Sequence, residues 1–366
     1  MKAIALKPGT KNIRLSDYPD PKIQNPDEIK AKVLRVGICG TDREEASGGR
    51  ANAPSGESEL IIGHEMVSQV VEVGSGVKRF KPGDHLVFTV RRGCGQCEAC
   101  HNDRYDMCAT GNYTERGIKG RHGFQSEYVV DKECFALSVP ASIADIAVLA
   151  EPMSVVEKAI DEAGIIQTAR LNFIKDKPHW LQGKTVLVAG LGPIGLLAGL
   201  ILSLRGAILL GLDVVDPNSA RAQIFKAMGG TYINDREVNI STFQKKYPDI
   251  KMIVEAAGIA KLDFDLLEML GINGVFVLTG VPGDQRPINV DGADIMRKLV
   301  LKNQVMLGSV NASIDHFKMG IADLEAASKK WPGLVQKMIS QKIPYAQFEK
   351  AFSEHSPDEI KVVIQW

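Results

Sequence analysis

The chain shows two patterns of apolar positions, one after the other. In the first third, apolar and polar residues alternate over short runs at 31–36, 67–73 and 86–90, with Gly and Pro between the runs. A period of two predicts strands that bury one face. Short strands separated by such turns are typical of a small barrel-like β domain, and we expect one at the N-terminal end.

Beyond a helical segment at 153–163, the apolar runs become continuous, which predicts buried parallel strands. The first of these runs, 184–189, leads into Gly190-Leu191-Gly192-Pro193-Ile194-Gly195 and a second helical segment. Similar runs follow at 207–213, 251–255, 274–279 and 305–310. Strands that alternate with helices predict an α/β domain of the doubly wound Rossmann type.

The glycine-rich segment has the spacing G-x-G-x-x-G and lies between a predicted strand and a predicted helix. Glycines there let a dinucleotide approach the backbone closely, and the N-terminus of the helix favours the negative charge of a pyrophosphate. The predicted dinucleotide-binding residues are Gly190, Gly192, Pro193, Ile194 and Gly195. Asp213 ends the next strand, where a carboxylate can accept hydrogen bonds from the adenosine ribose.

The residues after Asp213 are Val214, Val215 and Asp216, so no cation stands ready for a ribose 2′-phosphate. Two carboxylates would repel that group. We therefore expect NAD to be preferred, with NADP as the alternative. Arg221 is the residue that could reverse this preference.

After residue 311 the chain has a helical segment, 314–329, and a strand-like segment, 361–366. We expect this tail to rejoin the β domain. The β domain then comprises residues 1–155 and 308–366, and the cofactor-binding domain, residues 156–307, is inserted in it.

Composition limits the classes of function. The chain has 366 residues with 44 basic and 44 acidic side chains, whereas a nucleic-acid-binding protein normally shows a basic excess. The longest apolar run, 194–204, is shorter than the roughly 20 residues of a spanning helix, and the N-terminal segment is too short for a signal peptide. We expect a cytoplasmic protein with no nucleic-acid partner and no membrane contact.

Four of the six cysteines are crowded together: Cys94, Cys97, Cys100 and Cys108. The spacing C-x2-C-x2-C-x7-C lets the thiolates surround one tetrahedral ion, and four sulfurs leave no open position for a substrate. We therefore predict a structural zinc ion in a lobe at residues 91–110, the cysteine lobe. An iron–sulfur cluster is the alternative, but the single, separated fourth cysteine favours zinc.

Two further segments carry side chains that can bind a metal. Cys39 lies between glycines after a predicted strand, in a tight loop that leads into a polar surface loop. His64 and Glu65 offer an imidazole and a carboxylate side by side. A buried free cysteine and a capped turn are the alternatives. Glu151 precedes Pro152, which favours extended backbone at Glu151.

These motifs, in this order, resemble those of the zinc-dependent medium-chain alcohol dehydrogenases, and the resemblance spans nearly the whole chain. It rests on Cys39-Gly-Thr-Asp, Gly63-His64-Glu65, the cysteine lobe, Glu151-Pro152 and the glycine-rich segment. Arg91-Arg92-Gly93-Cys94-Gly95, Thr110-Gly111 ahead of Glu115, and Glu157-Lys158 look most like the glucose dehydrogenase branch known from archaea. The resemblance implies a GroES-like, β-rich catalytic domain beside the Rossmann domain.

The resemblance implies a catalytic zinc ion in addition to the structural one, so that each chain would hold two. Cys39 and His64 would bind it, and Glu65 or Glu151 would complete the ligand set. Asp42 would orient the His64 ring by accepting a hydrogen bond. Members of this family are dimers or tetramers, and a homodimer or homotetramer is expected here.

The implied reaction is hydride transfer from an alcohol carbon to a nicotinamide, with C1 of an aldose such as glucose as the donor and the lactone as the product. Zinc would lower the pKa of the substrate hydroxyl, and Thr41 would accept or pass on its proton. The implied substrate-binding residues are Thr41, Glu115, Glu151 and Asn311. A polyol, threonine or secondary-alcohol dehydrogenase of the same family is the alternative.

The sequence departs from this branch at several positions. Val90, Val155 and Leu301 stand where the branch places sugar-binding Asn, Asp and His, so the pocket is expected to be more apolar than a glucose site. Glu44 replaces the histidine of the family's proton relay. A regulatory protein that binds the cofactor without zinc is a further alternative, against which the retained zinc ligands argue.

Overall fold

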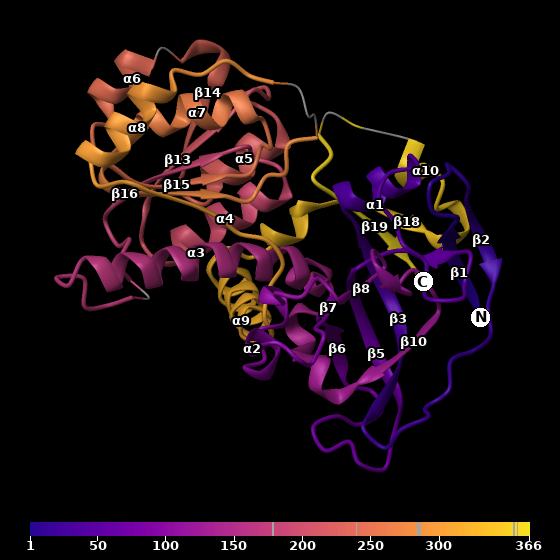
Figure 1. The fold of residues 1–366 in the computed structure, drawn as a ribbon. Helices are drawn as coiled ribbons and strands as arrows, with labels where there is room; N and C mark the ends of the chain where they lie inside the picture. The colour runs from indigo at the N-terminus through magenta and orange to yellow at the C-terminus, as the bar shows by residue number, and fades with distance from the viewer. Residues whose placement is uncertain (178, 239, 284–286, 354–355, 357) are drawn as a thin grey trace. The chain divides into compact units, whose positions relative to one another are not determined.

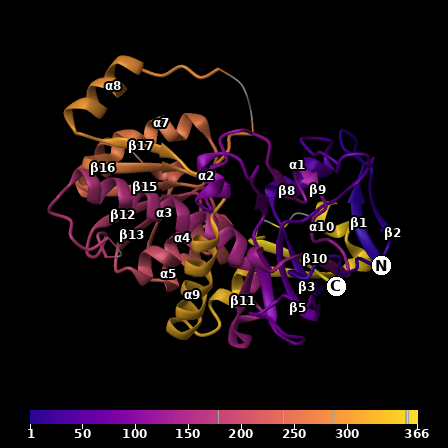
Figure 2. The ribbon, with the colours of Figure 1, turned by 60° about the horizontal axis from the view of Figure 1, so that its bottom comes forward.

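The computed structural model describes residues 1–177, 179–238, 240–283, 287–353, 356 and 358–366. These residues fall into two compact units. Unit 1 comprises Met1–Ser154 and Asn311–Trp366, and unit 2 comprises Val155–Val310. Figures 1 and 2 show the helices and strands of each unit from two directions. Within the described ranges, no helix has both the length and the apolar content that crossing a membrane requires.

Unit 1 is rich in short strands, as the alternating pattern predicts. Its strands are β1 (Lys2–Leu6), β2 (Ile13–Asp17), β3 (Glu28–Ile38), β4 (Leu60–Ile61), β5 (Glu65–Val73), β6 (His85–Phe88), β7 (Arg91–Arg92), β8 (Thr114–Arg116), β9 (Gly120–Arg121), β10 (Tyr128–Lys132), β11 (Ala136–Val139), β18 (Ile339–Pro344) and β19 (Lys361–Gln365). Its helices are α1 (Gly40–Ala46), α2 (Glu98–His101), α9 (Ile314–Lys330) and α10 (Lys350–Ser353).

The main sheet of unit 1 is organised around β3. Its strand order is β11-β6-β5-β3-β19-β18, and β10 also pairs with β3. Because β3 is long, it pairs with β10 near its start and with β19 near its end, both antiparallel. The C-terminal strand is thus part of the N-terminal sheet. Inward-facing side chains such as Ile29, Val33 and Phe124 are fully buried, and each stabilises the fold by roughly 1.5–3 kcal/mol.

Unit 2 is an α/β unit around a parallel sheet. Its strands are β12 (Thr185–Ala189), β13 (Ile208–Asp213), β14 (Thr231–Asn234), β15 (Ile250–Glu255), β16 (Leu270–Leu278) and β17 (Val305–Gly308). Its helices are α4 (Pro193–Leu204), α5 (Ala220–Ala227), α6 (Ile240–Lys246), α7 (Ala260–Met269) and α8 (Gly292–Leu301), and α3 (Ala150–Arg170) enters it from unit 1.

The strand order in unit 2 is β14-β13-β12-β15-β16-β17, with every pair parallel. In Figure 1, α6, α7 and α8 lie on one side of this sheet and α4 and α5 on the other. The inner strands β12, β13, β15 and β16 bury most of their side chains, which explains their apolar runs. The edge strands β14 and β17 are only partly buried, so the run at 305–310 is not a buried strand. The order places the β12 and β15 ends side by side, where open α/β sheets bind their ligands.

Two local predictions were wrong. The segment after Cys39 is not a loop: Gly40–Ala46 forms α1, and the Cys39 N–H donates to Asp42 Oδ2 at 2.8 Å, which caps the helix. Glu151 is not extended but helical, within the first turn of α3. Pro152 is tolerated there because the first backbone N–H groups of a helix have no intrahelical partner to lose.

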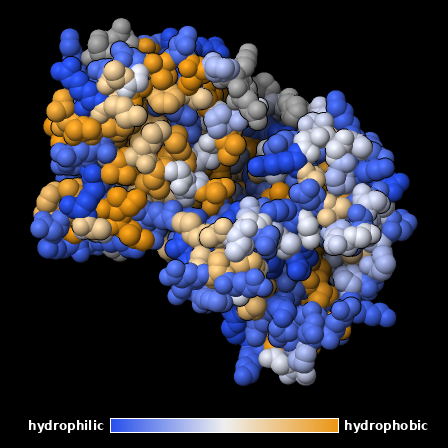
Figure 3. All heavy atoms as spheres, in the orientation of Figure 1, coloured by the Kyte–Doolittle hydropathy of each residue, from blue (hydrophilic) through white to orange (hydrophobic). Residues whose placement is uncertain are grey.

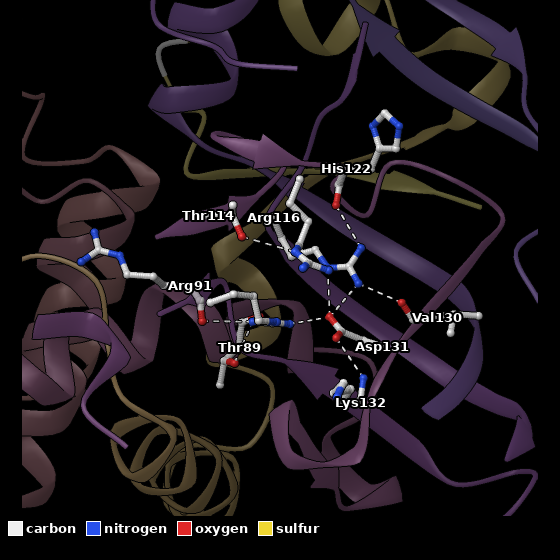
Figure 4. A network of polar contacts seen from close by, with 10 residues as sticks. Thr89, Arg91, Thr114, Arg116, His122, Val130, Asp131 and Lys132 are labelled. Atoms are coloured by element: carbon white, nitrogen blue, oxygen red, sulfur yellow. Dashed lines mark hydrogen bonds and ion pairs between the residues drawn. The ribbon is translucent and has the colours of Figure 1, made fainter. Parts of the chain in front are cut away.

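The cysteine lobe joins the body of unit 1 through β7 and β8, which pair antiparallel and which we call the neck. On one face of the neck, Arg92 and Arg116 are buried and turn to Asp131 on β10. Asp131 Oδ2 accepts hydrogen bonds from Arg92 Nη2 and from Arg116 Nε and Nη2, the last at 2.7 Å. Figure 4 shows Arg116 beside Asp131 in this network. A buried ion triad therefore fixes the neck to the sheet.

We expect Asp131→Ala to lower the free energy of unfolding of unit 1 by about 3–5 kcal/mol, because it leaves two guanidinium groups buried without an anion. Thermal unfolding of the purified chain checks this. The control is Asp17→Asn, which removes an exposed pair with Lys2 and should leave the midpoint unchanged. Equal midpoints for Asp131→Ala and the wild type would contradict the role of the triad.

The triad also predicts a pH dependence. Burial alone would raise the pKa of Asp131. The guanidinium groups of Arg116 and Arg92 lower it by more than burial raises it, so the pKa of Asp131 lies well below its usual range. Because the folded-state pKa is below the unfolded value of about 3.9, the stabilisation is complete above roughly pH 4 and is lost as the pH falls further. The difference in free energy of unfolding between the wild type and Asp131→Ala should therefore disappear only at strongly acidic pH.

Candidate functional site

The fold brings Cys39, His64 and Glu65 together in unit 1. Cys39 follows the end of β3 and caps α1. His64 immediately precedes β5, the strand that pairs with β3, and Glu65 is its first residue. One potential ligand atom from each residue lies within 4.8 Å of the other two. A thiolate, an imidazole and a carboxylate are ligands that zinc accepts.

Buried polar atoms around His64 support a metal at this position. Asp42 Oδ1 lies 3.6 Å from His64 Nδ1, beyond hydrogen-bond range, and among the described residues neither atom has a hydrogen-bond partner. Burial alone would lower the pKa of His64, but the carboxylate of Asp42 and the thiol of Cys39 raise it well above its usual range. A metal ion bound by Cys39 and His64 would give these buried acidic groups a positive partner.

Glu65 is held by a residue that sequence reasoning missed. Lys361 at the start of β19 donates to Oε1 and Oε2 of Glu65, at 2.7 Å each, and both side chains are almost fully buried. Burial would lower the pKa of Lys361, but the Glu65 carboxylate raises it above its usual value. Gly37, opposite Glu65 in the sheet, makes room for the pair because a Cβ there would collide with Glu65 Oε2.

Glu151 lies near this cluster but outside it. Its ligand atoms are not in the group of Cys39, His64 and Glu65 that could surround one ion. Burial raises the pKa of Glu151 to about 7, with His64 opposing and Glu65 adding to the rise. Glu65 is thus the carboxylate in ligand range, and Glu151 is near enough to interact with it electrostatically.

A second residue that sequence reasoning missed is the acid Glu45 in α1. It is fully buried, and within the described part of the chain neither of its carboxylate oxygens has a hydrogen-bond partner. Burial and the neighbouring Asp42 carboxylate raise its pKa to about 9. Glu45 follows Asp42 by three residues, which places both on one face of a helix. This spacing could have indicated the site only if α1 had been predicted as a helix.

In the cysteine lobe, Cys94, Cys97, Cys100 and Cys108 have Sγ atoms within 4.8 Å of one another, and all four are free thiols. Cys94 Sγ and Cys100 Sγ are 3.8 Å apart, and two thiolates at about 2.3 Å from a tetrahedral ion are separated by about that distance. Thr110 lowers the pKa of Cys94 to about 6, which favours the thiolate form. These residues fit a single structural zinc ion.

In unit 2, the glycine-rich segment forms the turn from β12 to α4. Gly190 has a φ of 85°, and a Cβ on Gly195 would collide with the Gly190 carbonyl oxygen, so both positions require glycine. A Cβ on Gly192, the residue that caps α4, would meet nothing within 4 Å. Pro193 and Ile194 open α4. This open helix N-terminus is suited to a pyrophosphate.

Asp213 ends β13 beside this turn. Its Oδ2 accepts a hydrogen bond from Leu191 N at 2.5 Å, and its Oδ1 accepts from Val214 N at 2.6 Å. The carboxylate is therefore fixed against the glycine-rich segment. Oδ1 also accepts from Val215 N at 3.3 Å, so Oδ2 is the oxygen that keeps a lone pair with which it can accept from a ribose hydroxyl.

The remaining predicted substrate residues lie as follows. Asn311 Nδ2 donates to Glu115 Oε1 at 2.8 Å, so these two are brought together in unit 1. Thr41 is half-buried in the first turn of α1. Val90 is buried in unit 1, whereas Val155 and Leu301 belong to unit 2, where Leu301 is largely exposed.

The chain matches known protein families over almost its whole length. Residues 25–141 match the alcohol dehydrogenase GroES-like domain, and residues 144–366 match the glucose dehydrogenase C-terminus. The chain is 36% identical to glucose 1-dehydrogenase of Methanocella arvoryzae and 38% identical to glucose 1-dehydrogenase 2 of Vulcanisaeta moutnovskia, over 100% of this chain and 99% of each relative. The solved structure of Haloferax mediterranei glucose dehydrogenase in complex with NADP, Zn and gluconolactone matches with a TM-score of 0.88 at 32% identity, over 100% of this chain and 99% of that one.

A GroES-like unit with two groups of metal ligands and a Rossmann unit with a dinucleotide loop define the class of two-domain dehydrogenases. The chain belongs to the zinc-dependent medium-chain alcohol dehydrogenase family, in its archaeal-type glucose dehydrogenase branch. The predicted fold class and the resemblance are both confirmed.

The contacts of Glu65 predict separable effects on metal content and stability. We expect Glu65→Ala to lower both, because it removes a candidate ligand and leaves the Lys361 ammonium buried alone, at a cost of about 3–5 kcal/mol. The double variant Glu65→Leu with Lys361→Met removes both charges, so the unfolding midpoint should recover while the zinc content stays low. Zinc content is measured by elemental analysis, with Glu151→Ala in parallel. Full zinc content in the double variant would make Glu65 only a structural acid.

Proposed function

We propose that this enzyme oxidises an aldose such as glucose at C1 and passes the hydride to a nicotinamide cofactor, with the lactone as product. The observation that carries the proposal is full-length similarity to glucose 1-dehydrogenases together with the clustering of Cys39, His64 and Glu65. A substrate hydroxyl, a metal and a hydride acceptor are the parts this reaction requires.

Cys39, His64 and a carboxylate from Glu65 or Glu151 would hold the catalytic zinc. When bound, zinc acts as a Lewis acid that lowers the pKa of the substrate hydroxyl. Asp42, whose Oδ1 lies 3.6 Å from His64 Nδ1, would orient the His64 ring from the Nδ1 side when the metal is bound. Burial of these groups keeps their electrostatic interactions strong.

Thr41 accepts the substrate proton or passes it on, since its hydroxyl has no hydrogen bond to any described residue and is half-buried. Glu115 and Asn311 bind hydroxyl groups of the substrate through a carboxylate and an amide, and Glu151 contributes a second carboxylate. Asp213 and the segment Gly190–Gly195 bind the cofactor. Asp213, with Asp216 nearby, favours NAD over NADP by repelling a 2′-phosphate.

The enzyme acts in the cytoplasm as a homodimer or homotetramer. β17 ends the strand order of unit 2, so its outer edge is a candidate for pairing with a second copy. Large apolar side chains are exposed on α8 and β17, among them Met296, Val300 and Met306, and Figure 3 shows hydrophobic residues gathered on the visible surface of unit 2. Sedimentation as a monomer at micromolar concentration would contradict this assembly.

A dehydrogenase for polyols, threonine or secondary alcohols is the second candidate. The observation that favours it is the apolar side chain at three positions where the branch places polar ones, of which Val90 is buried. Each hydroxyl left without a partner weakens sugar binding by roughly 1–3 kcal/mol.

A panel of aldoses, polyols, threonine and simple alcohols, each with NAD and with NADP, tests the proposal. We expect the highest kcat/KM for an aldose with NAD, with lactone as product. No activity on any aldose would reject the proposal, and activity only on polyols or secondary alcohols would support the second candidate. An equal or higher kcat/KM with NADP would overturn the cofactor preference alone.

A further inference from the structure

The face of the neck opposite the ion triad carries a second charged network, and it includes Glu115. Arg91 on β7 lies directly opposite Glu115 on β8. Because directly opposite residues of an antiparallel pair point to the same face, these two side chains meet. Arg92 and Arg116, one position further along each strand, point to the other face and bind Asp131. The neck thus has a structural face and a face that presents Glu115.

The Glu115 carboxylate is bound through one oxygen only. Oε1 accepts from Arg91 Nε at 3.0 Å, lies 2.9 Å from Arg91 Nη2, and accepts from Asn311 Nδ2 at 2.8 Å. Among the described residues, none donates to Oε2, and the side chain keeps 12% of its surface exposed. Three donors on Oε1 fix the plane of the carboxylate and leave Oε2 as the acceptor for a ligand.

Arg91 is itself fixed by the cysteine lobe. Its Nη1 donates to the backbone carbonyl of Asp106 at 2.7 Å, and its guanidinium group lies 3.9 Å from the centre of the Tyr113 ring. A guanidinium group can make these contacts at once because its donors form a rigid planar fork, whereas a lysine ammonium is a point charge. The position of the lobe backbone is therefore transmitted to Glu115.

We propose that Arg91 is a positioning residue for substrate recognition: anchored on the cysteine lobe, it holds Glu115 so that Oε2 accepts a hydrogen bond from a substrate hydroxyl. This inference rests on the proposed function, in which Glu115 contacts the sugar. It gives the cysteine lobe a role in substrate binding in addition to any role in stability.

Arg91 acts by restricting the conformation of the Glu115 side chain. Without Arg91, the Glu115 side chain would be held by Asn311 alone and would sample several rotamers. A substrate would then have to order the carboxylate as it binds, which weakens binding and leaves the bond-making step largely intact. Substrate affinity is therefore expected to respond to Arg91 more than turnover does.

A double-mutant cycle between Arg91 and Glu115 tests the proposal, with the zinc-loaded full chain and the best aldose of the panel. We expect Arg91→Lys and Glu115→Gln each to raise KM by about tenfold or more, with kcat within about threefold of the wild type. The variant with both changes should be no worse than Glu115→Gln alone, since Arg91 acts through Glu115. Zinc content and unfolding midpoint should stay at the wild-type values in Arg91→Lys.

Arg14→Lys is the control. Arg14 lies on β2, outside the cysteine lobe, and forms an exposed ion pair with Glu59. It should leave KM unchanged. A KM rise in Arg14→Lys as large as in Arg91→Lys would show a general effect of replacing an arginine in unit 1 and would overturn the proposal.

The remaining outcomes separate this inference from the function on which it rests. A wild-type enzyme that oxidises no aldose rejects the proposed function, and the role of Arg91 falls with it. An active enzyme in which Glu115→Gln leaves KM unchanged retains the function and overturns the role of Glu115 and Arg91. An Arg91→Lys effect of the same size with and without Glu115→Gln shows that Arg91 acts elsewhere, which also overturns the proposal.

Discussion

The buried ion pair between Glu65 and Lys361 is the interaction on which the proposed metal site depends. The two residues are 296 positions apart in the chain, on strands that flank β3 from opposite sides. Gly37 of β3 lies between them and leaves the space that the pair occupies. The carboxylate next to His64 is therefore oriented by the last strand of the chain, and the site is complete only when the C-terminal segment has joined the sheet.

The charges around this pair explain why the site suits a divalent cation. Asp42, Glu45 and Glu65 are all fully or almost fully buried, and Cys39 adds a thiol. Lys361 neutralises one carboxylate, and the raised pKa of Glu45 relieves some of the remaining repulsion. A bound metal would supply the missing positive charge, since opposite charges are strongly attracted where water is excluded. The pair with Lys361 also limits how readily Glu65 can turn toward the metal.

Local patterns predicted most of the fold because they report local physics. Continuous apolar runs marked β12 and β13, and the glycines at 190 and 195 marked a turn that no other residue fits. The two errors have local causes. The sequence of α1 is short and flanked by glycine, so its pattern resembled that of a loop. Pro152 lies in the first turn of α3, where a helix tolerates proline, so the preference for extended backbone before proline did not apply.

The part of the site that the sequence could not predict is the part formed by distant contacts. Lys361 begins an apolar strand, and the sequence alone does not distinguish it from an ordinary solvated lysine until β19 is placed beside β3. Arg91 and Glu115 are only 24 positions apart, but their pairing depends on the register of the neck across the cysteine lobe. The role of a side chain that contacts a distant part of the chain can be assigned only when the strand order and register are known.

The most direct test of the account is the zinc content of the purified chain and of His64→Ala. The account predicts two zinc ions per wild-type chain, one for each group of ligands, and one in His64→Ala, whose four-cysteine site remains intact. Two zinc ions in both proteins would contradict the assignment of Cys39, His64 and Glu65 as a metal centre.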